Sequence, residues 1–391
     1  MEIQGQVYLK KGREASPKRF HPWVFSGAIQ SIDGKPENGD WVVVMDATKK
    51  ALGYGHYQPG TITVRLLSFG EATPGANFYT QKIESSFVQR LSTKVIQETT
   101  NCYRLVHGEG DGLPGLIIDI YNEVAVMQAH SAGVHKDRKI ICEAVLKVVR
   151  HKLSAVYYKG MSSGDGKSES EYLHGECQIP HHIMEHGNKF LVDWETGQKT
   201  GFFLDQRENR NLLGQLAEGR TVLNTFCYTG GFSVYALKGG ASLVHSIDAS
   251  DRAIEMAKKN IDLNGFDSTL HSCVTIDTFD YLQDKKDQYD VIILDPPAFA
   301  KRKEARHQAM KGYQRLNAEA MRVIKSGGIL FTFSCSQVVD RQLFYDTVVS
   351  AAIQSGREIK VLYMLSQPSD HPVSIYHPEG EYLKGLVLLV S

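Results

Sequence analysis

Hydrophobic and polar positions along the chain follow three successive patterns. The first 75 or so residues contain short β-like runs separated by turn residues, namely WVVVMD (41–46), ALGYGHY (51–57) and TITVRLLSFG (61–70). Short strands at this spacing predict a small β-barrel. Residues 76 to about 182 combine strand-like runs, as in GLIIDIYNEVAVMQAH, with the helical period of DRKIICEAVLKVVRHKL. This second pattern predicts a central α/β domain.

From about residue 183 onwards, apolar runs alternate with helical stretches such as SDRAIEMAKKNIDLNG. The predicted strands are TVLNTF, LVHSID, HSCVTID, YDVIILDPP and GGILFTFSCS. Such alternation predicts βαβ units and an open, mostly parallel, Rossmann-like sheet. EIKVLYMLSQ and KGLVLLVS follow without an intervening helix, so the last strand is expected to be antiparallel. We therefore predict an α/β protein of three domains, 1–75, 76–182 and 183–391.

Composition limits the classes of partner. The 44 Lys and Arg residues balance 44 Asp and Glu residues, so a polyanion would have to meet a local basic patch. The six cysteines are scattered without a C-x-x-C pair, which argues against a zinc site or a disulfide framework. No signal-like N-terminus and no apolar run long enough for a membrane span are apparent. We expect a cytoplasmic protein with no metal and no membrane partner.

Two basic segments are candidates for RNA binding. The first precedes the aromatic residues Trp23 and Phe25, and the second follows the DPP sequence. Positive charge beside aromatic rings is typical of nucleic-acid binding, although a solvated basic face is the alternative. The predicted RNA-binding residues are Lys10, Lys11, Arg13, Lys18, Arg19, Lys301, Arg302 and Lys303.

A glycine pair in NTFCYTGGFS follows the first strand of the C-terminal domain and opens a helix. The sequence is not G-x-G-x-x-G, which disfavours a dinucleotide. Asp248 ends the second strand, where its carboxylate could accept both ribose hydroxyls, and Asp277 ends the third, within reach of an adenine amine. Two carboxylates and a glycine turn without a phosphate cradle predict S-adenosylmethionine (SAM), although an Asp at a strand end is often a helix cap.

The segment GQKTGFFLDQRENR lies just before the first strand of the C-terminal domain. It could line the part of the site that binds the methionine end of the cofactor. The alternative for this segment is an ordinary amphipathic helix entry. The predicted cofactor-binding residues are Gln198, Phe203, Gln206, Arg207, Asn224, Phe226, Tyr228, Thr229, Gly230, Gly231, Asp248, Ala249, Ser250, Asp277, Thr278 and Asp295.

The acceptor site is predicted at LDPPAF, where Asp295 ends an apolar strand and two prolines stiffen the backbone after it. A base nitrogen could attack the SAM methyl group directly. Carbon 5 of cytosine must first be activated by a thiolate adding to carbon 6. Cys335 ends the neighbouring strand and is the predicted nucleophile, favoured by nearby cations, and Cys227 in the glycine turn is the rival. A small apolar filler is the alternative for Cys335.

These motifs together resemble the bacterial 23S ribosomal RNA large-subunit methyltransferase I family. HPWVFSGAI and GYGHYQPGTITVRLLS resemble its PUA domain, GDGLPGLIIDIY its central domain, and GQKTGFFLDQRENR, NTFCYTGGFS, LDPPAF, SCS and HPEGEYLKGL its catalytic domain. The resemblance implies a class I SAM-dependent enzyme that forms 5-methylcytosine in 23S rRNA and releases S-adenosylhomocysteine (SAH). Cys335 matches the nucleophile of the family and Asp295 its base-contacting acid. DPPAF has no cysteine after the prolines, which leaves the base for the carbon 5 proton unidentified.

Two alternative functions remain open at this level. A SAM-dependent enzyme that methylates a guanine nitrogen shares similar segments and would not need Cys335. A non-catalytic RNA-binding ribosome-assembly factor could retain SAM as a structural ligand. Methylation of an adenine amine is less favoured, because DPPA lacks an aromatic residue after the prolines. The methylated nucleotide, the assembly state of the substrate and the formation of a homodimer are also left open.

Overall fold

The computed structural model describes residues 1–149, 153–160, 169–283, 285–300 and 302–391. The predicted RNA contact Lys301 lies outside these residues. The chain divides into two compact units, each built from segments that are distant in sequence. Unit 1 comprises Met1–Ile183, Val192–Phe202 and Ser369–Gly380, and unit 2 comprises Met184–Leu191, Phe203–Pro368 and Glu381–Ser391.

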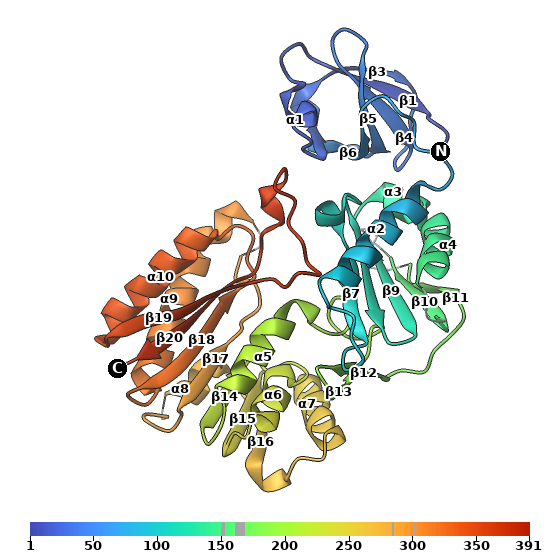
Figure 1. Ribbon diagram of the computed structural model, residues 1–391. Helices are drawn as coiled ribbons and strands as arrows, with labels where there is room; N and C mark the ends of the chain where they lie inside the picture. The colour runs from blue at the N-terminus through green and yellow to red at the C-terminus, as the bar shows by residue number, and fades with distance from the viewer. Residues whose placement is uncertain (150–152, 161–168, 284, 301) are drawn as a thin grey trace. The chain divides into compact units, whose positions relative to one another are not determined.

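Unit 1 begins with a curled six-stranded sheet in the order β2-β6-β5-β4-β1-β3 (Figure 1). Its elements are β1 (Gly5–Leu9), α1 (Ala15–Lys18), β2 (Trp23–Phe25), β3 (Ile29–Gly34), β4 (Trp41–Met45), β5 (Ala51–Tyr57) and β6 (Ile62–Phe69). Alternate residues of β1 point inward, so that Val7 and Leu9 pack with Val42 and Val64 in a small core. The predicted small N-terminal β domain is confirmed.

The second sheet of unit 1 has the order β11-β10-β9-β8-β7. Its strands are β7 (Cys102–His107), β8 (Leu116–Tyr121), β9 (Val124–Ala129), β10 (Ala155–Lys159) and β11 (Glu171–His174), accompanied by α2 (Phe78–Ser92), α3 (Ala132–Lys136) and α4 (Arg138–Val148). Apolar residues of α2 and α4, such as Phe87 and Val145, pack on Ile118 of the sheet. A separate two-stranded sheet is formed by β12 (His181–Glu185) and β13 (Asn188–Val192).

Unit 2 is built on a seven-stranded sheet in the order β16-β15-β14-β17-β18-β20-β19. Its strands are β14 (Thr221–Thr225), β15 (Leu243–Asp248), β16 (His271–Thr275), β17 (Val291–Leu294), β18 (Gly328–Ser334), β19 (Ile359–Ser366) and β20 (Lys384–Val390). Strand β20 runs antiparallel between β18 and β19, and the strands from β14 to β18 are parallel. The Rossmann-like sheet with an antiparallel last strand is therefore confirmed.

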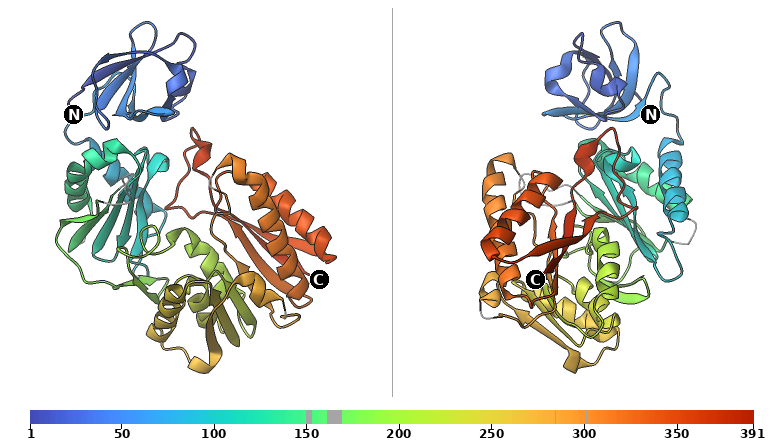
Figure 2. Two further views of the ribbon diagram at one scale, coloured as in Figure 1. Left: turned by 180° about the vertical axis from the view of Figure 1, so that it is seen from behind. Right: turned by 60° about the vertical axis from the view of Figure 1, so that its left-hand side comes forward.

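Helices cover both faces of this sheet (Figures 1 and 2). The helices are α5 (Arg207–Gln215), α6 (Gly231–Lys238), α7 (Asp251–Leu263), α8 (Thr278–Leu282), α9 (Arg306–Val323) and α10 (Arg341–Ser355). Strands β17 and β18 are buried along their whole length, as expected for central strands of a parallel sheet. Among the described residues, no helix combines the length and the apolar character needed to cross a membrane.

Candidate active site

The glycine turn after β14 has an unusual backbone. Phe226, Tyr228 and Gly230 have φ angles of 53°, 46° and 78°, and positive φ is uncommon for residues other than glycine. A Cβ atom at Gly230 would lie 3.0 Å from Ala257, so this position requires glycine for space as well as for conformation. The turn brings a chain of peptide groups to the carboxyl end of the sheet, where ligands of open α/β sheets bind.

Asp248 closes this turn from the neighbouring strand. Its Oδ2 accepts a hydrogen bond from the backbone N–H of Tyr228 at 3.0 Å, and its Oδ1 accepts one from Ser250 at 2.9 Å. The two bonds together use one lone pair on each carboxylate oxygen. An ionised carboxylate has about four acceptor sites, two on each oxygen. Asp248 is thus held rigidly and retains acceptor capacity on both oxygens. Ser250 also caps α7 through Ala253, at 3.3 Å.

Asp277 is the N-cap of α8. Its Oδ1 accepts hydrogen bonds from the backbone N–H groups of Phe279 at 2.7 Å and Asp280 at 3.4 Å. Strand β16 ends at Thr275, two residues before the predicted end. Asp277 is exposed, whereas Thr278 is buried in the first turn of the helix. The helix-cap interpretation therefore accounts for one oxygen of this carboxylate.

The segment before α5 packs onto the glycine turn. The Phe203 and Tyr228 rings meet edge to face, with centroids 5.1 Å apart. The segment is fixed by Arg210, which donates to the Phe203 carbonyl at 2.9 Å and pairs with Glu185 through two hydrogen bonds of 2.9 and 2.8 Å. Both partners of this ion pair are buried. Glu185 was not among the predicted residues, because it lies 25 positions upstream of Arg210, at the end of β12.

The other predicted cofactor residues fall into two groups. Gln206, Arg207, Asn224, Thr229 and Gly231 are buried in unit 2, where Phe226 is partly exposed and Ala249 is exposed. Gln198 is exposed and belongs to unit 1. The predicted cofactor residues other than Gln198 therefore all belong to unit 2.

The two predicted catalytic residues follow adjacent parallel strands. Leu294 of β17 is paired with Thr332 of β18, so Asp295 and Cys335 lie just beyond the same edge of the sheet. The thiol of Cys335 is 3.9 Å from the carbonyl oxygen of Pro296. Cys335 is partly exposed, as is Asp295. Both side chains are therefore partly open to solvent beyond neighbouring strands of the sheet.

Lys384 also lies at this end of the sheet, and the sequence analysis did not predict it as a site residue. Its Nζ donates hydrogen bonds of 2.7 Å to the carbonyl oxygens of Ser336 and Tyr382. Burial lowers the pKa of Lys384 to about 8, while the charge of the neighbouring Cys335 opposes this shift. The Tyr382 hydroxyl donates to Asp205 at 2.6 Å, which ties the start of β20 to the segment before α5.

The rival thiol, Cys227, has different surroundings. It is buried beneath the glycine turn, in a small cluster with Ile254 and Ala257. Burial raises its pKa well above the usual range, and Asp248 raises it further. Cys273 is partly exposed, and burial raises its pKa to about 11. A thiol reacts as the thiolate, so these surroundings disfavour both as nucleophiles.

The described basic residues are exposed in both segments. In unit 1, Lys18 lies 3.8 Å from Glu14 and from Asp46, and Lys10 donates to the Gly27 carbonyl at 3.0 Å. The remaining predicted residues of this segment are Lys11, Arg13 and Arg19. In unit 2, Arg302 and Lys303 precede α9.

Comparison with known proteins identifies the class. Residues 155–374 match the S-adenosylmethionine-dependent methyltransferase family, and residues 7–69 match the PUA-like domain family. The fold and the site thus define a SAM-dependent methyltransferase with an N-terminal PUA-like domain.

Curated relatives narrow this to one family. The chain is 39% identical to ribosomal RNA large subunit methyltransferase I of Aeromonas hydrophila, over 99% of both chains. It is 40% identical to the protein of the same name from Pseudoalteromonas atlantica, over 99% of this chain and 100% of the relative. The chain belongs to the ribosomal RNA large subunit methyltransferase I family.

Solved structures share the fold of the whole chain. The crystal structure of SMU.776 in complex with SAH is 25% identical and aligns with a TM-score of 0.85 over 100% of both chains. A structure from Streptococcus mutans, 24% identical, has the same fold with a TM-score of 0.83 over 100% of both chains.

Proposed function

We propose that this protein methylates carbon 5 of a cytosine in 23S ribosomal RNA and that Cys335 forms a transient covalent bond with that base. The observation that carries the proposal is the position of Cys335 and Asp295 beyond two adjacent parallel strands, with Lys384 beside the thiol. The name of the curated relatives supports ribosomal RNA of the large subunit as the substrate. An enzyme with this substrate works in the cytoplasm.

The residues at the glycine turn fit SAM. The Asp248 carboxylate, held by two backbone N–H groups, keeps acceptor capacity on both oxygens for the two hydroxyls of a ribose. We assign the adenine amine to Asp277 and the methionine end to the segment from Phe203 to Arg207. When bound, SAM supplies an electrophilic methyl group.

The chain's own residues act on the base. The Cys335 thiolate adds to carbon 6 and forms a C–S bond as the C5–C6 π electrons shift into the ring, while the Asp295 carboxyl group gives its proton to N3 and takes it back when the C–S bond later breaks. Carbon 5 thereby becomes nucleophilic. After carbon 5 has gained the methyl group, it loses its proton to a base, the C–S bond breaks and the thiolate leaves. The Lys384 ammonium stabilises the thiolate before addition and after release.

We assign delivery of the RNA to the two basic segments. Residues 1–75 form the proposed RNA-binding domain, 76–182 the central domain and 183–391 the catalytic domain. Extruding a base from a stack costs a few kcal/mol, which contacts outside the pocket must offset. The exposed Lys11, Arg13 and Arg19 in unit 1 and Arg302 in unit 2 are suited to phosphate contacts.

A covalent trap tests this proposal. Fluorine at carbon 5 cannot leave as a proton does, so 23S rRNA containing 5-fluorocytosine should remain attached to the wild-type enzyme in the presence of SAM. The Cys227→Ala variant should form the same adduct. Cys335→Ala should form none, and should still bind SAM with unchanged affinity in calorimetry.

Methylation by Cys335→Ala at the wild-type rate would contradict the covalent mechanism. Nucleoside mass spectrometry of the product would then distinguish methylation of a guanine nitrogen from 5-methylcytosine. Loss of the adduct in Cys227→Ala, with retention in Cys335→Ala, would assign the nucleophile to the glycine turn.

A further inference from the structure

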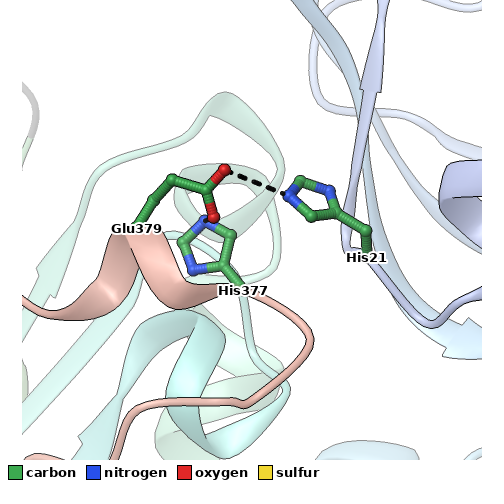
Figure 3. A group of neighbouring side chains, drawn as sticks. All are labelled: His21, His377 and Glu379. Atoms are coloured by element: carbon green, nitrogen blue, oxygen red, sulfur yellow. Dashed lines mark ion pairs between the residues drawn. The ribbon is translucent and has the colours of Figure 1, made fainter.

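A group of three potential metal ligands lies within unit 1, separate from the residues assigned to methylation. His21 precedes β2, and His377 and Glu379 belong to the segment Ser369–Gly380. One ligand atom from each side chain lies within 4.8 Å of the other two. Figure 3 shows that both imidazole rings face the carboxylate of Glu379.

The distances within the group are close to those in a metal site. His21 Nε2 lies 3.6 Å from Oε1 of Glu379, and His377 Nε2 lies 3.8 Å from Oε2 of the same carboxylate. Ligands bound tetrahedrally to Zn²⁺ at about 2.0–2.1 Å are separated by about 3.3–3.4 Å. Movements of a few tenths of an ångström would bring each imidazole to that separation from the carboxylate, and the two imidazole nitrogens lie within 4.8 Å of each other. Nδ1 of His21 accepts a hydrogen bond from the backbone N–H of Trp23 at 3.2 Å, so zinc binding at Nε2 requires the ring proton to move to Nδ1 and this hydrogen bond to break.

His377 provides independent evidence for a ligand. Only 3% of its surface is exposed, and among the described residues neither of its ring nitrogens has a hydrogen-bond partner. Burying an imidazole without a partner is unfavourable. Trp23 packs against this ring with centroids 4.4 Å apart, and its own N–H donates to Glu109 at 2.9 Å rather than to His377. A metal ion would satisfy the buried ring.

The segment that carries two of the ligands is anchored to the second sheet of unit 1. The backbone N–H of Arg104 donates to Asp370 at 3.0 Å, and Arg90 donates to the Asp370 carbonyl at 2.9 Å. Asp370 is fully buried and also pairs with His371 at 3.0 Å. His377 and Glu379 are therefore presented by a fixed segment.

We propose that His21, His377 and Glu379 bind one Zn²⁺ ion. Two imidazoles and one carboxylate are ligands that zinc favours, whereas Mg²⁺ and Ca²⁺ prefer oxygen ligands alone. The Glu379 side chain is 53% exposed, so water can take the fourth position. The ion connects His21, which precedes β2, to the segment Ser369–Gly380 and stabilises the packing of these two segments within unit 1.

The proposal departs from the sequence-based expectation of no metal. That expectation came from the spacing of the cysteines, none of which takes part in this site. The ligands come from opposite ends of the chain, so no local motif identifies them. The proposal is also independent of the methylation chemistry.

Metal titration of the full chain tests the site. After treatment with a chelator, the protein should bind one equivalent of Zn²⁺ in calorimetry and should melt at a higher temperature with zinc than with magnesium. Co²⁺ in place of zinc should give the visible bands of tetrahedral coordination without a thiolate charge-transfer band. The control His307→Gln, an exposed histidine on α9, should behave as the wild type.

The variants His21→Gln, His377→Gln and Glu379→Gln should each weaken zinc binding. Loss of an outer-shell partner typically costs about 10- to 100-fold in affinity, so loss of a direct ligand should cost at least about tenfold. Glu379→Gln changes an exposed residue and keeps the fold testable if His377→Gln does not fold. Zinc affinity in Glu379→Gln equal to that in His307→Gln, or no binding by the wild type, would overturn the proposal.

Discussion

The Sγ atom of Cys335 lies 3.9 Å from the carbonyl oxygen of Pro296, the residue that follows Asp295. This contact is possible because β17 and β18 are adjacent and parallel, with Leu294 paired to Thr332. Asp295 directly follows β17 and Cys335 directly follows β18, so the order of the strands sets the positions of the carboxylate and the thiol. In the proposed mechanism, this placement lets a cytosine that contacts Asp295 reach the thiol of Cys335.

Lys384 should control the pH dependence of methylation. Its ammonium stabilises the Cys335 thiolate, so Lys384→Met should lower kcat at pH 7 by on the order of tenfold, equivalent to about 1.4 kcal/mol. The activity of the variant should recover partly as pH rises, because hydroxide then generates the thiolate. Lys384→Arg keeps the charge and should retain a profile closer to the wild type. A kcat that falls equally at every pH would indicate a structural role only.

The same variant gives a stability test. The pKa of Lys384 is lowered by burial from 10.5 to about 8. Between these values the unfolded chain keeps the proton and the folded chain loses it, so folding stability rises with pH in this window. Relative to Lys384→Met, the free energy of unfolding of the wild type should increase by on the order of 3 kcal/mol from pH 8 to 10.5. Urea titrations at several pH values measure it.

Asp248 should be required for SAM affinity. Asp248→Ala removes a charged partner of two hydroxyls and also frees the Tyr228 N–H from its acceptor. A loss of about 1.5–3 kcal/mol, roughly 10- to 150-fold in Kd, is expected in calorimetry. The control Asp251→Asn changes an exposed carboxylate in the first turn of α7 and should bind SAM normally. Equal affinities in the two variants would exclude the ribose contact.

Two variants of Asp277 distinguish a role in capping α8 from a role in binding SAM. Asp277→Ala loses the N-cap of α8, which costs about 1 kcal/mol of stability, whereas serine keeps a capping oxygen. If the carboxylate also contacts adenine, both variants should bind SAM more weakly than the wild type, and only the alanine variant should lose stability. Normal SAM binding by Asp277→Ser would leave Asp277 with the cap alone.

The Arg210–Glu185 pair should support the fold of the segment before α5. Arg210→Met leaves a buried carboxylate with Tyr235 as a remaining donor at 3.0 Å, and loss of one partner of a buried pair costs about 3–5 kcal/mol. The double variant Arg210→Met/Glu185→Leu should recover much of this stability in urea unfolding. The SAM affinity of the Arg210→Met variant and of the double variant should both stay below that of the wild type, because both lack the hydrogen bond from Arg210 to the Phe203 carbonyl.

Much of the fold was predictable because the buried strands of unit 2 are short apolar runs with charged or turn residues at their ends. β17 reads VIIL and is followed directly by Asp295. A parallel order of these strands predicts from the sequence alone that Asp295 and Cys335 lie at the same end of the sheet. Details at strand ends differed, as at Asp277, where the chain forms a helix cap two residues beyond β16.

The remaining site residues depend on pairing between distant segments. Lys384 reaches Ser336, 48 positions away, because β20 is inserted antiparallel beside β18. Glu185 and Arg210 meet across 25 positions. Neither pair lies at a spacing that a helix or a hairpin would bring together, so hydrophobic periodicity contains no signal for them. A buried lysine in a strand, as in LKGLVLLV, is the one local anomaly that points to Lys384.

The N-terminal basic segment should determine the salt dependence of RNA binding. Lys11, Arg13 and Arg19 are exposed, whereas Lys18 lies near Glu14 and Asp46. Each phosphate contact contributes about 0.7–0.9 to the slope of log K against log salt. Replacing these three residues with glutamine should therefore reduce the slope by roughly 2–3 and leave SAM affinity unchanged.

A charge-matched control separates local contacts from net charge. The triple variant Lys35→Gln, Lys238→Gln, Lys360→Gln removes three exposed positive charges elsewhere on the chain. Filter binding to a 23S rRNA fragment at several salt concentrations should give this control a slope near that of the wild type. Equal slopes in the two triple variants would mean that the segment around Trp23 is a solvated surface, because a true contact surface must lose counterion release when its own cations are removed.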